Sequence, residues 1–187
     1  PLLCVLGLLL LGHAQPAMGQ ANFVWVNTTE DLPIQPGHCL AGQVCTFRQA
    51  LLRAEGRQGT VTACFEPGVV PGGRACPGGA LPLTRQDPNY DAATGRWHLE
   101  VGLGTVSFVL AAGGTSIDFS HGIETWSGPQ DNRVVLDGNV GREGSTSDPR
   151  TDVILIEGTD NTLRGFEIRG NYSLAAVIVR KGAANNQ

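Results

Sequence analysis

The chain has 187 residues, a formal net charge of −4 and 41% hydrophobic residues. This length fits one domain with a hydrophobic core of its own. Aromatic residues make up only 6%, so the core is expected to be built from Val, Ile, Leu and Ala. The mild acidity and the lack of a clustered run of Lys and Arg in the sequence argue against nucleic acid as a partner.

The N-terminal region reads as a secretory signal peptide. Residues 2–12 are an apolar run that is shorter than the roughly 20 residues needed to cross a bilayer. Small residues follow at Ala17, Gly19 and Ala21. The pattern predicts a signal peptide over residues 1–19, with cleavage after Ala21 and an uncleaved membrane anchor as the alternatives. The mature chain is expected to contain no transmembrane segment.

Both ends of the sequence look truncated. The starting Met and a basic region before the apolar run are missing, and Pro1 already begins inside that run. At the other end, Gln187 is where the repeat described below predicts another strand. We therefore expect a fragment of a longer secreted, extracellular or cell-surface protein.

Four cysteines remain after the predicted signal peptide: Cys39, Cys45, Cys64 and Cys76. An even number of cysteines in an exported chain favours disulfides, and four allow three connectivities. Pairing Cys39 with Cys45 and Cys64 with Cys76 closes two short loops and is the favoured choice. A four-cysteine zinc site is the alternative, although the spacing lacks a C-x2-C knuckle.

The first predicted elements are a strand and a helix. Residues 23–27 alternate and are rich in β-branched and aromatic side chains, which predicts a strand. Residues 46–55 predict a helix, because Thr46 can act as N-cap and Gln49 can complete a capping box. Its apolar face, at helical spacing, consists of Phe47, Ala50, Leu51 and Ala54. Arg48 and Arg53 lie off this face and are expected to be solvent-exposed.

Further strands are predicted along the rest of the chain. They cover Thr60–Phe65, Arg96–Val101, Thr105–Ala111, Thr115–Phe119 and Thr162–Arg169. Residues 66–95 are rich in Gly and Pro and are expected to be irregular. Residues 139–151 are expected to form a polar loop.

A repeat near the C-terminus gives the strongest architectural signal. Residues 153–161 are echoed after 24 residues by residues 177–185, and a further copy begins at Val134. Each copy is a β-branched run, a charged residue, a glycine and a turn with asparagine. Such a period is typical of a solenoid, because one unit cannot bury its apolar face alone. Asn161 and Asn185 are expected to be structural, stacking at equivalent turns.

Residues 45–50, Cys-Thr-Phe-Arg-Gln-Ala, resemble the CSLREA motif of secreted right-handed parallel β-helix proteins, with Cys, Arg and Ala kept. Residues 23–31 resemble the opening strand of that family, and residues 162–170 are similar to a β-helix rung consensus. The resemblance implies an all-β, right-handed parallel β-helix (solenoid) of pectate-lyase-like architecture over residues 60–187. It also implies an N-terminal cap over residues 20–59, in which the amphipathic helix covers the first rung.

Enzymes of this architecture need acids or bases at equivalent positions of adjacent rungs. Asp137 and Glu157 recur at one repeat position, but Lys181 occupies the third, which favours a solvated ladder. A glycosidase pair of carboxylates is the alternative for the acids of residues 118–137. That set contains Asp118, Glu124, Asp131 and Asp137. Because Asp is frequent in turns, these are expected to be surface acids.

Other candidate residues are also expected to be incidental to catalysis. His38, His98 and His121 are scattered, with no H-x-x-x-H or Ser-His-Asp spacing. Residues 87–91 match the first acidic and amide positions of a calcium loop, but Ala92 and His98 stand where Gly and Glu are required. A turn is therefore favoured over calcium, and no cofactor is expected. Residues 27–29 and 171–173 match the glycosylation sequon.

Two functional hypotheses follow. The first is a secreted or cell-surface protein with an adhesive, structural or carbohydrate-contacting role, with a polysaccharide or cell-surface ligand as partner and no catalytic residues in this segment. The second is a polysaccharide lyase or glycoside hydrolase whose active site lies on rungs beyond residue 187. Architecture alone does not decide between them.

Overall fold

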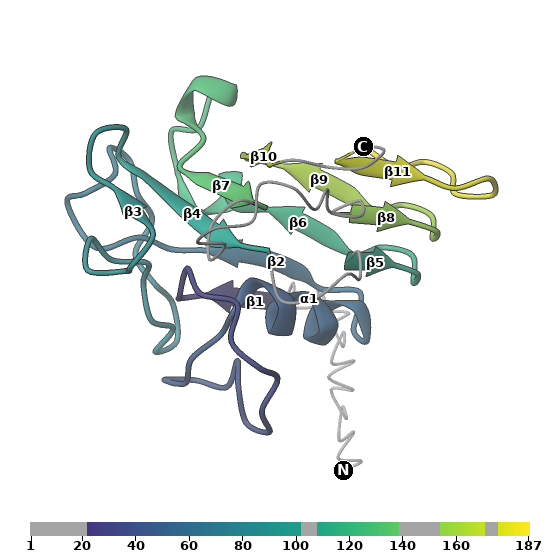
Figure 1. The fold of residues 1–187 in the computed structure, drawn as a ribbon, viewed down its shortest axis with the longest axis horizontal. Coiled ribbons are helices and arrows are strands. Elements are labelled where there is room, and N and C mark those ends of the chain that lie inside the picture. Colours follow the sequence, from purple (N-terminus) through teal and green to yellow (C-terminus); the bar gives the residue numbers. More distant parts are fainter. Residues whose placement is uncertain (1–21, 102–107, 139–153, 171–175) are drawn as a thin grey trace, which may run out of the picture.

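The computed structural model describes residues 22–101, 108–138, 154–170 and 176–187 (Figure 1). The predicted signal peptide, the sequon at Asn171 and the predicted polar loop over 139–151 lie outside the described residues. The helices are α1 (Phe47–Glu55) and the 3₁₀ turns η1 (Phe119–Gly122) and η2 (Pro129–Asp131). The strands are β1 (Phe23–Val26), β2 (Thr60–Ala63), β3 (Tyr90–Asp91), β4 (Arg96–Glu100), β5 (Phe108–Leu110), β6 (Ser116–Asp118), β7 (Val134–Asp137), β8 (Ile154–Ile156), β9 (Thr162–Arg164), β10 (Phe166–Arg169) and β11 (Val177–Val179).

These strands form three small sheets around one core. Their orders are β1-β2-β6-β9, β10-β7-β4-β3 and β11-β8-β5. All pairs are parallel except the hairpin of β3 and β4, which is antiparallel. Parallel strands cannot be joined by a tight turn, so the connections between them pass through α1, another sheet or an irregular segment.

The predicted all-β, right-handed parallel β-helix is wrong. The described residues form three separate sheets, none of which closes, with both parallel and antiparallel pairing and a helix that belongs to the core. The repeat led to the wrong fold because it aligned Val134 with Ile154 as equivalent positions of one sheet. Val134 pairs with Trp97 and Phe166 in one sheet, whereas Ile154 pairs with Phe108 and Val177 in another.

The repeat also misplaces the register of its last two copies. β8 and β11 are parallel neighbours, but Val177 lies opposite Ile154, a shift of 23 residues instead of the expected 24. The buried strand residues therefore differ from those that the repeat aligned. A shift of one residue reverses which side chains face the core.

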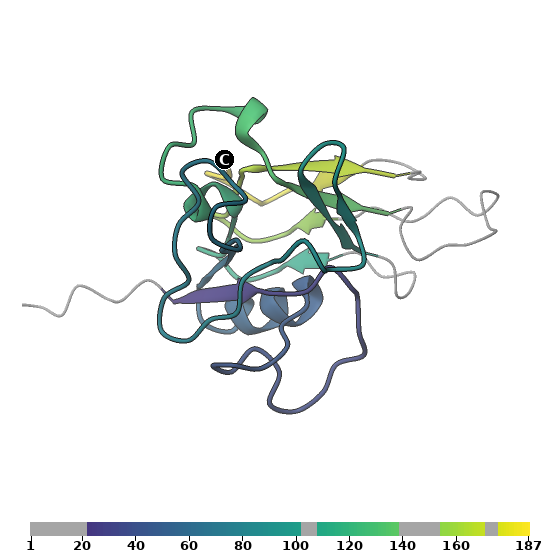
Figure 2. The same ribbon diagram turned by 90° about the vertical axis from the view of Figure 1, so that its left-hand side faces the viewer.

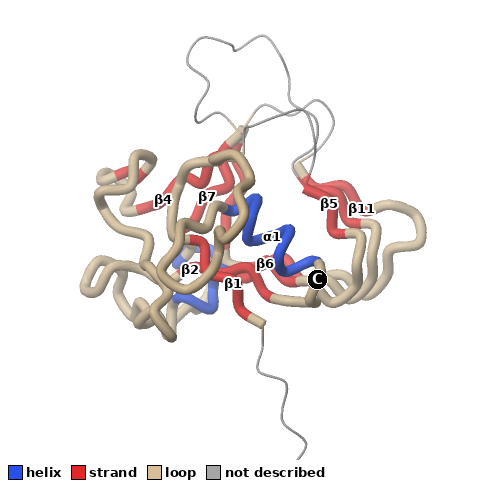
Figure 3. The backbone as a smooth tube through the Cα atoms, turned by 90° about the horizontal axis from the view of Figure 1, so that it is seen from below, coloured by secondary structure: helices blue, strands red, loops and turns tan. Residues whose placement is uncertain are grey.

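α1 closes one end of the core. Thr46 caps it by accepting a hydrogen bond from the Gln49 amide, and the Gln49 side chain accepts a hydrogen bond from the Thr46 main-chain amide. Phe47 and Leu51 are 1% and 3% exposed and pack into the common core. Seen from below, α1 lies between the sheet of β4 and β7 and the sheet of β5 and β11 (Figure 3). Arg48 departs from expectation, because its side chain is only 18% exposed and binds Asp31.

Two disulfides join Cys39 to Cys45 and Cys64 to Cys76. These are the favoured pairs, and they exclude the four-cysteine zinc site. Two disulfides are typical of proteins that fold in an oxidising compartment. Among the described residues, no helix is long and apolar enough to span a membrane.

Candidate functional site

A cleft lies beside β1, between two loops that are each closed or followed by a disulfide. β1 alternates so that Val24 and Val26 are buried in the core, while Phe23 and Trp25 are half-buried on the outer face of the sheet. This follows from the two-residue period of a strand, which sends neighbouring side chains to opposite faces. β1 is an edge strand of its sheet (Figure 2), so its outer face and edge are open to neighbouring loops.

Three rings cluster on this outer face. The imidazole of His121, from η1, stacks on Phe23 with ring centroids 4.2 Å apart and an interplanar angle of 18°. Trp25 lies 5.8 Å from Phe23 and 6.0 Å from His121, tilted to both by about half a right angle. The tilted indole therefore forms a corner with the stacked pair instead of extending it as a flat platform.

The first wall of the cleft is the loop closed by Cys39 and Cys45. Asn27 clips this loop to the end of β1, because its side-chain amide donates to the Gln43 carbonyl at 2.8 Å and accepts from the Cys45 amide at 2.7 Å. The Asn27 main-chain amide also donates to the Cys45 carbonyl at 3.0 Å. The loop is thus fixed at both a disulfide and a strand end.

The second wall is the segment from Pro77 to Leu81, which follows the Cys64–Cys76 disulfide. Just beyond it, the Leu83 amide donates to the Cys64 carbonyl at 2.9 Å, which holds the segment against the end of β2. The two walls and β1 enclose a pocket of about 580 Å³. Its lining consists of Phe23, Val24, Trp25, Asn27, Cys39, Leu40, Ala41, Gly42, Gln43, Cys45, Pro77, Gly78, Ala80 and Leu81. None of these lining side chains is charged.

His121 stays close to neutral at physiological pH. Burial beside Phe23 is the main cause that lowers the pKa of its imidazole below 6.5, and the Arg74 guanidinium adds to it. The charge of Asp118 raises the pKa of His121, but this effect is smaller than the two that lower it. The lowered pKa favours the neutral form of the His121 ring, which stacks on Phe23 beside the cleft.

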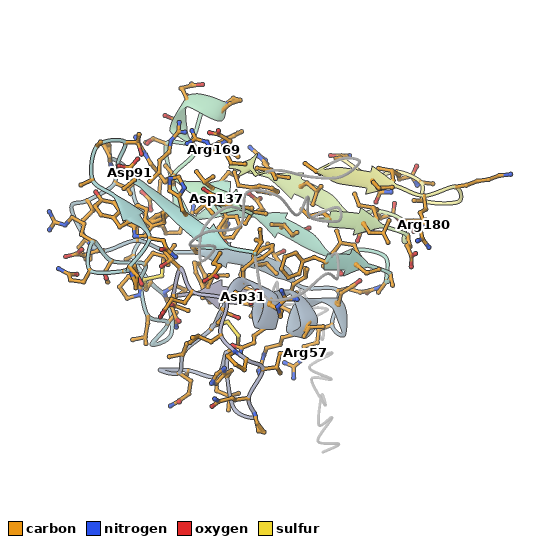
Figure 4. All side chains as sticks on the ribbon, in the orientation of Figure 1. Asp31, Arg57, Asp91, Asp137, Arg169 and Arg180 are labelled. Atoms are coloured by element: carbon orange, nitrogen blue, oxygen red, sulfur yellow. A yellow bond between two sulfur atoms is a disulfide. The ribbon has the colours of Figure 1, made fainter. Side chains whose placement is uncertain are left out.

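A second group of polar side chains lies on the outer face of the β10-β7-β4-β3 sheet, where Asp91, Asp137 and Arg169 gather (Figure 4). His98 Nδ1 lies 2.8 Å from Asp137 Oδ2, and the two side chains are 14% and 10% exposed. His98 Nε2 is buried and has no hydrogen-bond partner among the described residues. The carboxylate thus fixes the imidazole on one side only.

Charged partners surround this pair. In register, Asp137 lies between Glu100 and Arg169 on the neighbouring strands. Glu167 accepts from Arg169 at 2.5 Å and from Arg96 at 2.7 Å. The Arg169 hydrogen bond is the main cause that lowers the pKa of the Glu167 carboxyl, with smaller effects from both Arg169 and Arg96 charges. The arrangement is a charge ladder across three strands.

The acids considered as a glycosidase pair lie on separate elements, and two of them make local hydrogen bonds. Asp118 caps η1 by accepting from the Ser120 amide, and Asp131 accepts from the Ser127 amide at 2.7 Å. Glu124 is exposed in the loop after η1. Asp137 pairs with His98 as described above.

The three repeat positions are not equivalent either. Glu157 follows β8 and binds Arg180 at 2.6 Å, while Lys181 is exposed in the turn after β11. Asp137 lies in a different sheet from both. The expected ladder therefore does not form: Asp137 pairs with His98, Glu157 pairs with Arg180, and Lys181 lies in an exposed turn.

The incomplete calcium loop forms two turns. Asp87 accepts from the Thr84 amide at 2.6 Å, and Asp91 accepts from the Thr94 hydroxyl at 2.6 Å. His38 precedes Cys39, and its buried Nδ1 has no hydrogen-bond partner among the described residues. Among the described residues, no group of three or more His, Cys, Asp or Glu side chains could hold a metal ion.

The stacked turn asparagines are Asn161 and Asn186, not Asn161 and Asn185. The Asn161 side chain accepts from the Thr115 amide at 3.0 Å, and the Asn161 amide donates to the Asn186 side chain at 2.9 Å. Asn185 is exposed and adopts a positive φ of 55°. The turn after β11 is longer than the turn after β8, which displaces the asparagine that stacks.

The comparisons with known proteins add no relative. No protein-family model, curated protein or solved structure matches this chain significantly. The site must therefore be interpreted from its own geometry.

Proposed function

We propose that this chain is a secreted binding domain that contacts neutral carbohydrate through the cleft beside β1. The observation that carries the proposal is that the half-buried rings of Phe23 and Trp25 line a pocket whose other lining side chains are uncharged, with the His121 imidazole stacked on Phe23 beside it. A sugar ring has an apolar C–H face and a rim of hydroxyls. The faces of aromatic rings carry partial negative charge and therefore pack favourably against the apolar C–H face of a sugar.

The free edge of β1 offers main-chain hydrogen-bonding groups to the hydroxyls of a sugar. The Asn27 amide points away from β2 toward the Cys45 carbonyl, whereas the Asn22 carbonyl points toward Thr60 of β2. Because strand residues alternate, the main-chain groups of Phe23 and Trp25 share the outward direction of Asn27. They supply N–H donors and C=O acceptors next to the rings, as expected of a pocket that combines apolar area with a few placed polar groups.

The two disulfides support an extracellular setting for this role, because disulfides persist in oxidising compartments. They also fix both walls of the cleft. A rigid cleft loses less conformational entropy when a ligand binds. An adhesive or surface-display role fits the same site, with the glycan as the contacted surface.

Neutral oligosaccharides titrated against the protein, with the heat of binding measured by isothermal titration calorimetry, test the proposal. Trp25→Ala should weaken binding at least about tenfold, equivalent to about 1.4 kcal/mol. Trp126→Ala is the matched control, because Trp126 is also half-buried but lies under Arg164, outside the cleft. Since the lining carries no charge, binding should change little with salt. Equal loss in both variants, or binding only of acidic glycans, would contradict the proposal.

A polysaccharide lyase or hydrolase is the second candidate, and the His98–Asp137 pair is the observation that favours it. A carboxylate that orients an imidazole is a feature of general-base catalysis. However, His98 Nε2 is buried, so no substrate reaches it in this conformation. Release of reducing ends or unsaturated sugars that is lost in His98→Ala would favour the enzyme over the binding domain.

A further inference from the structure

The end of the molecule opposite α1 carries three edge strands. β9, β10 and β11 are each the last strand of their sheet, and both ribbon views place them together, away from α1 (Figures 1 and 2). Edge strands present main-chain donors and acceptors that can pair with another chain. At the other end of the core, α1 packs against β1, β2 and β5.

The core is only half covered at this end. Phe166 and Ile168 of β10 are half-buried, whereas their register partners Val134 and Leu136 on β7 are 0% exposed. The same step from buried to half-buried occurs between Ile117 and Leu163 and between Ile154 and Val177. An opening of about 360 Å³, lined in part by Leu163, Phe166, Ile168 and Val177, lies here. This is apolar area that another surface would bury.

β10 is the strand best suited to pair. The edge of β9 already bonds to the chain itself, because the Leu163 amide donates to the Gln187 carbonyl at 2.7 Å. On β10, the Arg169 carbonyl accepts from Gly138 at 2.8 Å on the β7 side. By alternation, the main-chain groups of Phe166 and Ile168 point the other way, off the edge of the sheet.

The charges of β10 decide what partner fits. Glu167 and Arg169 flank Ile168 on the outer face. If two β10 strands meet antiparallel with Ile168 opposite the partner's Ile168, each Glu167 lies opposite the partner's Arg169. Opposite charges facing each other across a strand pair are favourable, and like charges are not. The edge is therefore complementary to itself.

We propose that two copies of this chain associate through the β9-β10-β11 end, with β10 antiparallel to the partner's β10 about a two-fold axis at Ile168. Such an isologous contact pairs each β10 edge with the other and therefore closes at a dimer. The proposal does not depend on the cleft beside β1, whose residues lie on other elements.

Sedimentation velocity across a range of protein concentrations tests the proposal. The wild-type chain should show twice the monomer mass at high concentration. Glu167→Arg and Arg169→Glu should each shift the protein to monomer, because they place like charges opposite each other. The double variant E167R/R169E restores the opposite pairs and should restore the dimer. Glu66→Arg is the control, since it disrupts the distant Glu66–Arg85 pair and should leave the mass unchanged.

Hydrogen exchange of the wild-type protein provides a readout that no substitution can disturb. The Ile168 amide points off the sheet edge and should become protected only at concentrations where the dimer forms. The Leu136 amide, in the middle of its sheet, should be protected at every concentration. A monomer at all concentrations, or dimers in all four variants alike, would overturn the proposal.

Discussion

Arg48 binds the carboxylate of Asp31 through two nitrogens, with Nε 2.9 Å from Oδ1 and Nη2 2.7 Å from Oδ2. Its guanidinium also lies 4.7 Å from the centre of the Phe108 ring. Asp31 is buried, with 1% of its side chain exposed, and its amide donates to Glu100 at 3.3 Å. One arginine therefore joins α1, the segment after β1 and the beginning of β5.

Replacing Arg48 should be costly because it leaves the buried Asp31 carboxylate without its main cation. Arg48→Met should lower the free energy of unfolding by about 3–5 kcal/mol. Adding Asp31→Asn to that variant should recover much of the loss, since no buried charge remains. Urea unfolding of the three variants measures both effects. A loss below about 1 kcal/mol, the scale of an exposed pair, would show that the pair is solvated.

α1 contributes to stability through one face. Phe47→Ala should lower the free energy of unfolding by about 3–5 kcal/mol, because the ring is 1% exposed and packs edge-on against Phe108 at 4.9 Å. Leu52→Ala is the control, because Leu52 is 57% exposed on the same helix. It should change stability by about 0.5 kcal/mol or less. Thermal unfolding followed by circular dichroism distinguishes the two, and equal effects would mean that α1 does not close the core.

Gly165, between β9 and β10, has two reasons to be glycine. Its φ is +78°, and a Cβ there would lie 2.1 Å from the Ser120 amide nitrogen. Gly182 has a φ of +103° but open space around it. Gly182→Ala should therefore cost about 1–3 kcal/mol for the backbone conformation alone. Gly165→Ala should cost clearly more, because the new Cβ also collides with the Ser120 main chain. Chemical denaturation measures both losses, and an equal loss at the two positions would show that the main chain at Ser120 shifts to make room for the Cβ.

The lowered pKa of His121 predicts a pH dependence with a definite sign. Folding favours the neutral imidazole, so the contribution of His121 to stability is present above the unfolded value of about 6.5 and is lost as pH falls through the folded pKa. His121→Gln should flatten stability over this acidic range. NMR titration of the ring measures the pKa directly, and a value at or above 6.5 would contradict the burial of His121 beside Phe23.

Local patterns in the sequence predicted local structure well. Helix α1 follows from apolar spacing and the Thr46–Gln49 capping box, and these features involve residues close in sequence. The alternation in residues 23–26 also indicates that Phe23 and Trp25 share a face. The repeat correctly placed β8 and β11 side by side but missed their register by one residue.

Long-range contacts were not visible in the sequence. His98 and Asp137 are separated by 39 positions and meet only because Leu99 lies opposite Leu136 in the sheet. His121 reaches Phe23 through the pairing of β1, β2 and β6, and no pattern in the sequence links these three strands. The cleft depends on two loops whose placement follows from the disulfides. A hydrophobic period shows which residues are buried, but not which sheet receives them.

The clip made by Asn27 has a consequence for how the protein is produced. Asn27-Thr28-Thr29 is a sequon, yet both atoms of the Asn27 amide are already bonded to Gln43 and Cys45, and Thr29 is buried. A eukaryotic secretory host that attached a glycan to the nascent chain would occupy the nitrogen that holds the Cys39–Cys45 loop. Material from such a host and material from a bacterial periplasm would then differ at the mouth of the cleft, although their amino-acid sequences were identical.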